Sequence, residues 1–159
     1  MRRMIIVVAL VAAPTFARDS LGVFEGWGAF RDAKPFRCYA IARPESSSGG
    51  KCRPFATVSN WPAEGVRGQI NIRLSREIRK GTSVTLTVDN RRAVMIGAAA
   101  DAWAPSRQVD AAIVSAMRNG RSMSIEAVAA TGGGFADTYA LRGAATAIDA
   151  AALGCARAR

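Results

Sequence analysis

The sequence predicts a mainly β protein, an antiparallel β-sandwich or open barrel, with two short helices packed against its strands. Several short segments alternate apolar and polar residues, and turn residues separate these segments. Two later segments instead repeat their apolar residues at helical spacing. Runs of strands interrupted by two short helices are typical of a sandwich or barrel with helical additions.

The first alternating segments are predicted to be strands with one buried face. QINIRLS (69–75) and SVTLTV (83–88) each place an apolar residue at every second position. A turn at Asp89 and Asn90 then leads into AVMIG (93–97). We therefore expect these three segments to form a β-meander.

A second pair of strands is expected further along the chain. SMSIEAVA (122–129) and the segment that starts with FADTYALRG at 135 are joined by TGGG (131–134). Glycine adopts positive φ without steric cost, and neither a helix start nor a nucleophile follows the three glycines. The segment is therefore interpreted as a hairpin turn and not as a phosphate-binding loop.

The first predicted helix begins after Pro105, with Ser106 as its N-cap, and ends at Asn119 and Gly120. Its apolar face consists of Val109, Ala112, Ile113, Ala116 and Met117.

The second predicted helix spans about 144–153, and Gly154 is expected to stop it. Ile148, Ala151 and Ala152 lie on one side of this helix. Alanine favours helix but buries little area, so we expect the helix to pack flat against a sheet.

The N-terminus is predicted to be a secretory signal peptide, residues 1–17. A basic start, ten apolar residues at 4–13 and a short tail that ends at Ala17 follow the order of such signals. Ten apolar residues are too few to cross a bilayer, which needs about 20. We expect residues 18–159 to form a single domain that is periplasmic or secreted, without a transmembrane segment in the mature chain.

The chain is strongly basic, with 22 Lys and Arg against 12 Asp and Glu and a formal net charge of +10. Arginine suits phosphate and carboxylate groups, so an anionic partner is one interpretation and a solvated basic surface is the other. For an exported protein the partner would be an envelope or host-surface protein or polyanion, and no nucleic acid is expected.

Two basic stretches supply the candidate anion-binding residues. They belong to one patch if the neighbouring hairpins align, and the alternative is a charged edge that discourages aggregation of the sheet. The candidates are Arg73, Arg76, Arg79, Lys80, Arg91 and Arg92.

The residue types argue against an enzyme. The chain has no histidine, which excludes Ser-His and Cys-His nucleophilic sites and His-ligated zinc. The carboxylates show no recognisable pairing, and a Ser-Lys dyad would need Lys34, Lys51 or Lys80, each in a predicted turn or loop. We predict a non-enzymatic protein with a binding or envelope-structural role, and without a catalytic site, metal or cofactor.

Cys38 and Cys52 are predicted to form a disulfide. An exported chain favours disulfides, and two cysteines opposite each other in a hairpin lie within bonding range. Cys155 then remains free, pairs with another chain, or is the true partner of one of the other two. Next to this disulfide, we expect Trp27, Phe30 and Phe36 to pack in the core and at its edge. The loop at 44–51, which the two cysteines would enclose, is the segment best placed to contact a partner.

The chain resembles the invasion-associated locus B (IalB) family of exported alphaproteobacterial proteins. The resemblance rests on the Trp27 strand, the Cys38 strand, Cys52 and residues 101–152, where a helix ending in Gly, a strand, a hairpin and Leu-x-Gly before an Ala-rich helix follow in that order. Many members carry a further cysteine pair before the first helix, where this chain has MIGAAADAWA (95–104). The resemblance implies a periplasmic or surface-associated β-rich protein, linked in some pathogens to host-cell invasion, with no established enzymatic mechanism.

Overall fold

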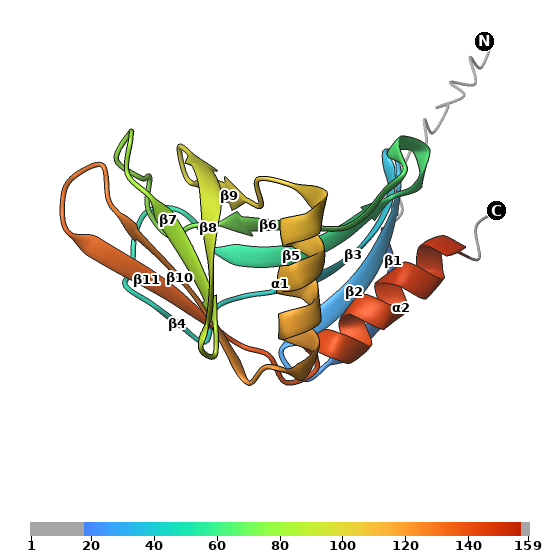
Figure 1. Ribbon diagram of the computed structural model, residues 1–159. Helices are drawn as coiled ribbons and strands as arrows, with labels where there is room; N and C mark the ends of the chain where they lie inside the picture. The colour runs from blue at the N-terminus through green and yellow to red at the C-terminus, as the bar shows by residue number, and fades with distance from the viewer. Residues whose placement is uncertain (1–17, 157–159) are drawn as a thin grey trace, which may run out of the picture.

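The computed structural model describes residues 18–156, so the predicted signal peptide lies outside the described residues. Eleven strands form one antiparallel sheet in the order β1-β2-β3-β5-β6-β9-β8-β7-β10-β11-β4, and the sheet bends around two helices (Figure 1). The predicted fold class is therefore confirmed. The first strands are β1 (Arg18–Phe24), β2 (Trp27–Ala33), β3 (Phe36–Ala42), β4 (Ser46–Ser47), β5 (Phe55–Trp61) and β6 (Val66–Arg73). They are followed by β7 (Val84–Val88), β8 (Arg91–Ala98), β9 (Asp101–Trp103), β10 (Ser122–Val128) and β11 (Gly134–Ala140), with a short 3-10 helix η1 (Pro62–Glu64) and the helices α1 (Arg107–Asn119) and α2 (Ala144–Ala156).

Both predicted hairpins form, but the predicted meander is wrong in one respect. The β7–β8 pair turns at Asp89 and Asn90, and the β10–β11 pair turns at the glycines of 131–134. However, β6 does not pair with β7, because β9 and β8 lie between them in the sheet. The long segment between β6 and β7 leaves room for this insertion, which local alternation does not reveal.

Helix α1 begins and ends as predicted. The Ser106 side chain accepts a hydrogen bond from the Val109 N–H at 3.3 Å, and the Gly120 N–H donates to the Ala116 carbonyl at 2.8 Å. Ile113 and Met117 are buried in the hollow of the sheet. The helix lies over the middle of the sheet in Figure 1, where the Asp110 carboxylate accepts a hydrogen bond from the Ile70 N–H of β6 at 2.8 Å.

Helix α2 packs against β1, β2 and β3, as expected of an Ala-rich helix (Figure 1). The prediction that Gly154 stops it is wrong, because the helix continues to Ala156. A Cβ atom at Gly154 would lie 2.5 Å from the Leu21 side chain, so this glycine allows the helix to approach β1 closely. No helix in the described range is long and apolar enough to span a membrane.

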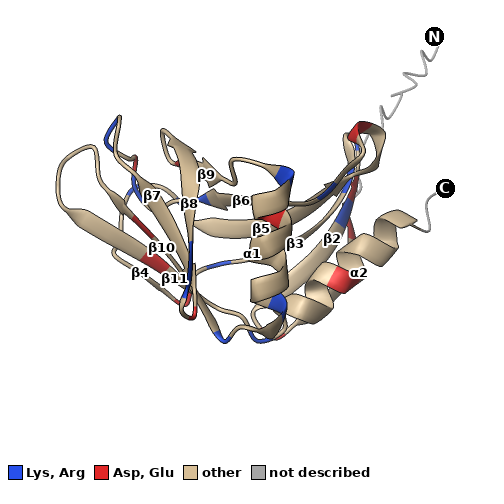
Figure 2. Ribbon diagram, viewed as in Figure 1, with Lys and Arg blue, Asp and Glu red and all other residues tan. Residues whose placement is uncertain are grey.

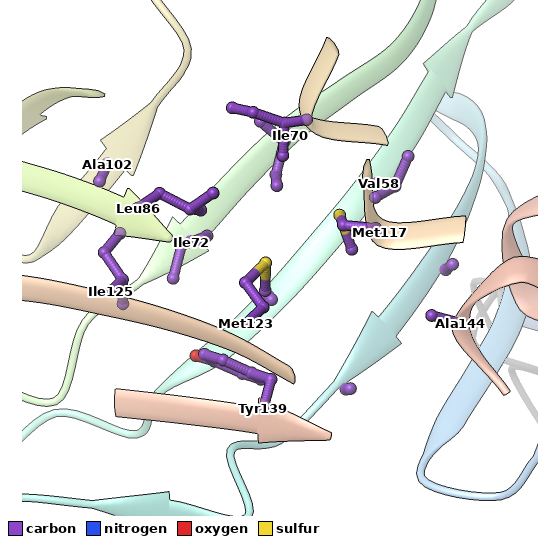
Figure 3. Packing of buried hydrophobic residues seen from close by; sticks show 14 of the residues in the cluster. Val58, Ile70, Ile72, Leu86, Ala102, Met117, Met123, Ile125, Tyr139 and Ala144 are labelled. Carbon is purple, nitrogen blue, oxygen red and sulfur yellow. The ribbon is translucent and has the colours of Figure 1, made fainter. Parts of the chain in front are cut away.

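The core fills the space between the inner face of the sheet and the two helices. Figure 3 shows side chains of β5, β6, β7, β10, β11 and α1 meeting there, among them Val58, Ile72, Leu86 and Met117. Strands β7 and β10 alternate buried and accessible positions along their length, as the sequence predicts for strands with one buried face. Trp27 is fully buried and donates its indole N–H to the Ala140 carbonyl at 2.9 Å, which joins β2 to β11.

The disulfide joins Cys38 to Cys155, so the predicted Cys38–Cys52 pairing is wrong. Strands β3 and β5 do pair, but their register sets Cys38 opposite Asn60, whereas Cys52 precedes the start of β5. Cys38 points to the inner face, where the end of α2 brings Cys155 to a Cα–Cα distance of 5.7 Å. The bond therefore ties α2 to the sheet, and Cys52 retains a free thiol.

Residues 44–51 are consequently not a loop enclosed by a cysteine pair. The segment lies along the edge of β11, where Ser47 and Ser48 form hydrogen bonds with the strand. The Arg76 side chain donates to the carbonyls of Ser48 at 2.8 Å and Gly49 at 2.5 Å. These bonds hold the segment on the sheet.

Asp137 of β11 connects three parts of the chain. Its buried carboxylate accepts a hydrogen bond from the Ser47 hydroxyl at 2.5 Å and another from the Ser75 N–H at 2.8 Å. Burial, with the charge of Asp137 as a second cause, raises the pKa of the neighbouring Tyr139 phenol. The carboxylate therefore fastens the edge strand β4 and the segment after β6 to β11.

Candidate functional site

A cleft of about 650 Å³ opens on the face of the sheet opposite the helices. It crosses β3, β5, β6 and β9, and the first residue of β1 borders it. We call it the arginine-aromatic cleft. It is lined by Arg18, Arg37, Tyr39, Ile41, Phe55, Thr57, Ser59, Trp61, Gln69, Ile70, Asn71 and Trp103.

Strand alternation places these side chains on one face. In β3, Cys38 and Ala40 point into the core, so Arg37, Tyr39 and Ile41 point to the opposite face. The register then sets Tyr39 beside Ser59 of β5. The same alternation continues across β6 and β9, because Thr57 pairs with Asn71 and Asn71 pairs with Trp103.

Two guanidinium groups stack on the aromatic rings at one end of the cleft. The Arg37 guanidinium lies 4.5 Å from the ring centre of Tyr39 and 5.2 Å from that of Trp61. The Arg18 guanidinium lies 5.8 Å from Tyr39 and 6.0 Å from Phe30. These distances are within the range of cation–π attraction. Tyr39 is consequently only 3% exposed, although none of the helices and strands in the described part of the chain covers this face.

Asp32 holds both arginines in place. Its carboxylate accepts hydrogen bonds from the Nε of Arg18 at 3.0 Å and the Nε of Arg37 at 2.9 Å. Burial acts to raise the pKa of Asp32, but the hydrogen bonds from the two arginines outweigh it and the pKa is lowered. Burial and the charge of Asp32 raise the pKa of Tyr39. Two cations thus face one carboxylate, and this end of the cleft keeps a net positive charge.

The six cations predicted to bind an anion do not form one patch. Arg91 pairs with Val88 at one end of the β7–β8 hairpin, whereas Arg79 and Lys80 precede β7 at its other end. Five strand residues separate these ends, a length of about 17 Å. Figure 2 likewise shows Lys and Arg spread over the molecule instead of gathered at one place.

Two of the other predicted cations, Arg73 and Arg76, already have partners. Arg73 forms an ion pair with Asp101 at 2.5 Å, and Arg76 binds the carbonyls of the segment 44–51. Arg91 and Arg92 lie at an apolar groove of about 520 Å³ between α1 and the β7–β8 hairpin. Anion binding by these residues stays a prediction, but a single site made of all six is excluded by the topology.

Sequence reasoning missed Arg18 and Arg37, the cations that do lie together. The signal was present in FRCYAIA, where alternation places Arg37, Tyr39 and Ile41 on one face. The expectation for the aromatic residues holds for Trp27, which lies in the core. Phe36 is partly buried against the core, whereas Phe30 lies on the outer face under Arg18. Residues 18–156 contain no group of three or more His, Cys, Asp or Glu side chains placed to hold a metal ion.

Comparison with protein families matches residues 29–152 to the family described as invasion associated locus B (IalB) protein. The chain belongs to the IalB family. The match covers both helices in large part and every strand except β1 and the start of β2, so it includes all of the cleft except Arg18.

A solved structure has the same fold as this IalB family member. It is the crystal structure of invasion associated protein B from Bartonella henselae, with a TM-score of 0.57 and 15% sequence identity. The alignment covers 84% of this chain and 97% of that chain. A search of curated proteins found no match.

Proposed function

We propose that this IalB family member is an exported, non-enzymatic binding protein of the periplasm or cell surface, and that the arginine-aromatic cleft holds its ligand. The cleft is the observation that carries this proposal. It combines the partly exposed rings of Trp61 and Trp103, hydroxyl and amide groups and a net positive end, on a face that no helix within residues 18–156 covers. Concave sites with apolar walls and a few directed polar groups are typical of ligand binding.

The chemistry of the lining supports binding over catalysis. The titratable groups among the lining residues are Arg18, Arg37 and Tyr39. Arginine keeps its proton in proteins, and the raised pKa of Tyr39 keeps its phenol protonated at neutral pH. Asp32 lies under both guanidinium groups and its lowered pKa makes it a poor base. The side chains that line the cleft therefore include no group that accepts a proton near pH 7.

The disulfide supports export, because such bonds persist in oxidising compartments such as the bacterial periplasm. Cleavage after Ala17 would make Arg18 the first residue of the mature chain. N-terminal sequencing of the protein recovered from the periplasm or the medium tests this expectation. Recovery of the full-length chain from the cytoplasm alone would contradict it.

We propose an anionic component of the envelope or of a host surface as the ligand. Each guanidinium has five N–H donors, and Arg18 and Arg37 each use one of them on Asp32. The remaining donors are available for a carboxylate or phosphate, which arginine binds with paired hydrogen bonds. The proposed anion site is therefore formed by Arg18 and Arg37 and not by the cations predicted between residues 73 and 92.

Heparin chromatography with matched charge variants tests this site. We compare R18Q/R37Q with K80Q/R92Q, since each double variant removes two positive charges. The cleft variant is expected to elute at clearly lower salt than the control variant, because polyanion binding weakens with each cation removed from the site that holds it. Equal shifts for the two variants would mean that binding follows net charge alone, and would refute the cleft as the site. Thermal unfolding of each variant checks that it is folded.

A further inference from the structure

We propose that the ligand of the arginine-aromatic cleft is an acidic sugar chain whose rings carry carboxylates. This inference rests on the proposed function and names the chemical class of its ligand. A sugar ring offers an apolar face of C–H groups and a rim of hydroxyl groups. A site for it needs aromatic surfaces for the faces and hydrogen-bonding groups for the rims.

The cleft has aromatic surfaces on both sides of a polar floor. Trp61 stands at the end of β5 near the arginines, and Trp103 stands across the sheet on β9. Both rings are partly exposed, so each has surface available for stacking. A ligand that spans the cleft therefore meets an aromatic side chain at each side, as a chain of several rings requires.

The floor between these rings carries hydroxyl and amide groups at regular spacing. Ser59, Thr57, Gln69 and Asn71 come from β5 and β6, whose adjacent positions on one face lie about 5 Å apart across the strands. The Thr57 hydroxyl donates to the Asn71 carbonyl, which leaves its oxygen free to accept. The Ser59 hydroxyl lines the cleft beside it and can both donate and accept. Thr57 and Ser59 are only 8% and 5% exposed, so the floor offers the hydroxyl rim of a sugar mainly Gln69 and Asn71, with the two hydroxyl groups beneath them.

The charge at one wall requires an acidic sugar and not a neutral one. Arg18 and Arg37 share the single carboxylate of Asp32 through their Nε atoms. Their terminal nitrogens remain available, and those of Arg37 lie beside Trp61. A ring carboxylate placed there would form paired, charge-assisted hydrogen bonds while its ring lies against the aromatic group.

The sheet itself argues against an extended peptide as the ligand. A peptide that binds a sheet by strand addition needs an open strand edge. Strands β3 and β5 have a paired neighbour on both sides. Strand β6 pairs with β5 on one side and, over Asn71–Arg73, with β9 on the other, and its Ile70 N–H donates to Asp110. Most of the floor therefore has no open strand edge, and the ligand is recognised mainly by side chains. Sugar chains are recognised in that way.

The experiment uses the mature protein and three probes: a hexamer of galacturonic acid, its neutral methyl ester, and linear hexaphosphate. The indole N–H signals of the three tryptophans are followed by NMR, since Trp27 is buried and bonded to Ala140 and serves as an internal control. The uronate hexamer is expected to shift the signals of Trp61 and Trp103 and to leave Trp27 unchanged. The methyl ester is expected to bind about tenfold more weakly, because it lacks the charge-assisted bonds.

Three variants separate the sugar chemistry from charge. R37Q is expected to weaken binding of the uronate hexamer about tenfold, whereas the control R92Q, outside the cleft, changes it less than about twofold. W103A is expected to weaken the uronate hexamer by about tenfold or more and to leave hexaphosphate unaffected, because only a ring stacks. S59A removes one hydroxyl and little volume, so it tests the floor in a variant that is expected to fold.

The outcomes distinguish this inference from the proposed function. If hexaphosphate binds as tightly as the uronate hexamer, and R37Q weakens both while W103A and S59A weaken neither, the sugar class is refuted and the anion-binding cleft stands. If the uronate hexamer fails to bind at millimolar concentration, the sugar class is also refuted. If R37Q has no larger effect than R92Q on any probe, both the sugar class and the proposed site are refuted.

Discussion

The outer face of the sheet differs between its two halves. The first half, made of β1, β2, β3, β5, β6 and β9, carries the stacked arginines and aromatic rings of the cleft. The second half, made of β7, β8, β10 and β11, carries mostly small hydroxyl-bearing side chains on β7, β10 and β11: Thr85, Thr87, Ser124 and Thr138, together with Ala136 and Glu126. Of the rings in the first half, Tyr39 is buried beneath the arginines, whereas Trp61 and Trp103 are partly exposed and offer surface for binding.

The inner faces differ in how they are fastened. In the first half, the Cys38–Cys155 disulfide ties α2 to β3. In the second half, the buried carboxylate of Asp137 ties β11 to the segments around Ser47 and Ser75. One half thus depends on a covalent bond and the other on hydrogen bonds, and variants of each show how much stability each contributes.

Removal of the disulfide is expected to have the largest effect. The bond joins residues 117 positions apart, and a loop of that length contributes about 5 kcal/mol by the chain-entropy argument. We expect C38A/C155A to lower the free energy of unfolding by about 4 kcal/mol, measured by urea denaturation without reductant. The control C52S should change it by less than about 1 kcal/mol, because Cys52 is only partly buried. A folded wild type with more than one reactive thiol, or a C52S variant as unstable as C38A/C155A, would contradict the pairing.

Removal of the Asp137 carboxylate is expected to have the next largest effect. D137A leaves the buried Ser75 N–H without an acceptor, so we expect a loss of about 3 kcal/mol. The control E126A lies exposed on the neighbouring strand and should change stability by less than about 0.5 kcal/mol. Hydrogen exchange at the Ser75 amide should accelerate in D137A alone. Unchanged protection of that amide would show that Asp137 does not fasten the second half.

The local features of the fold were predictable from the sequence. Ser106 and Gly120 bound α1 because a cap needs only the residues next to it. The turn at Asp89 and Asn90 likewise joins neighbouring strands. The order of the sheet was not predictable, because the insertion of β9 and β8 beside β6 depends on contacts between distant segments.

The cysteine pairing was predicted wrongly, and the cleft was not predicted at all, for the same reason. Cys155 reaches Cys38 only because α2 folds back over β3, and the hairpin geometry considered for Cys52 concerns nearby residues. The cleft collects side chains from five strands, from Arg18 to Trp103. Alternation identifies which side chains share a face within one strand, but the register between strands decides which of them meet.

The smallest expected effect is electrostatic, and it has opposite signs on the two faces of the first half. On the outer face, the pKa of Asp32 is lowered from its ordinary value of 3.8, since the bonds from Arg18 and Arg37 outweigh the effect of burial. The unfolded chain then binds more protons in the window just below pH 3.8, and the stability contributed by Asp32 is lost as the pH falls through it. On the inner side, burial raises the pKa of Asp110, with the Ile70 N–H bond acting weakly against it. Here the folded chain binds more protons, so stability is lost as the pH rises above 3.8 toward the raised pKa.

The variants D32N and D110N test whether the two carboxylates change stability with pH in opposite directions. Relative to wild type, D32N should lose stability between pH 3 and pH 7, by roughly 1 kcal/mol or less because the ion pairs are partly exposed. D110N should gain relative stability over the same range, since its amide oxygen still accepts the Ile70 N–H bond and no charge is buried. Urea denaturation at several pH values measures both differences. Parallel profiles would show that the two carboxylates have similar surroundings, and would remove the electrostatic distinction between the cleft face and the core face.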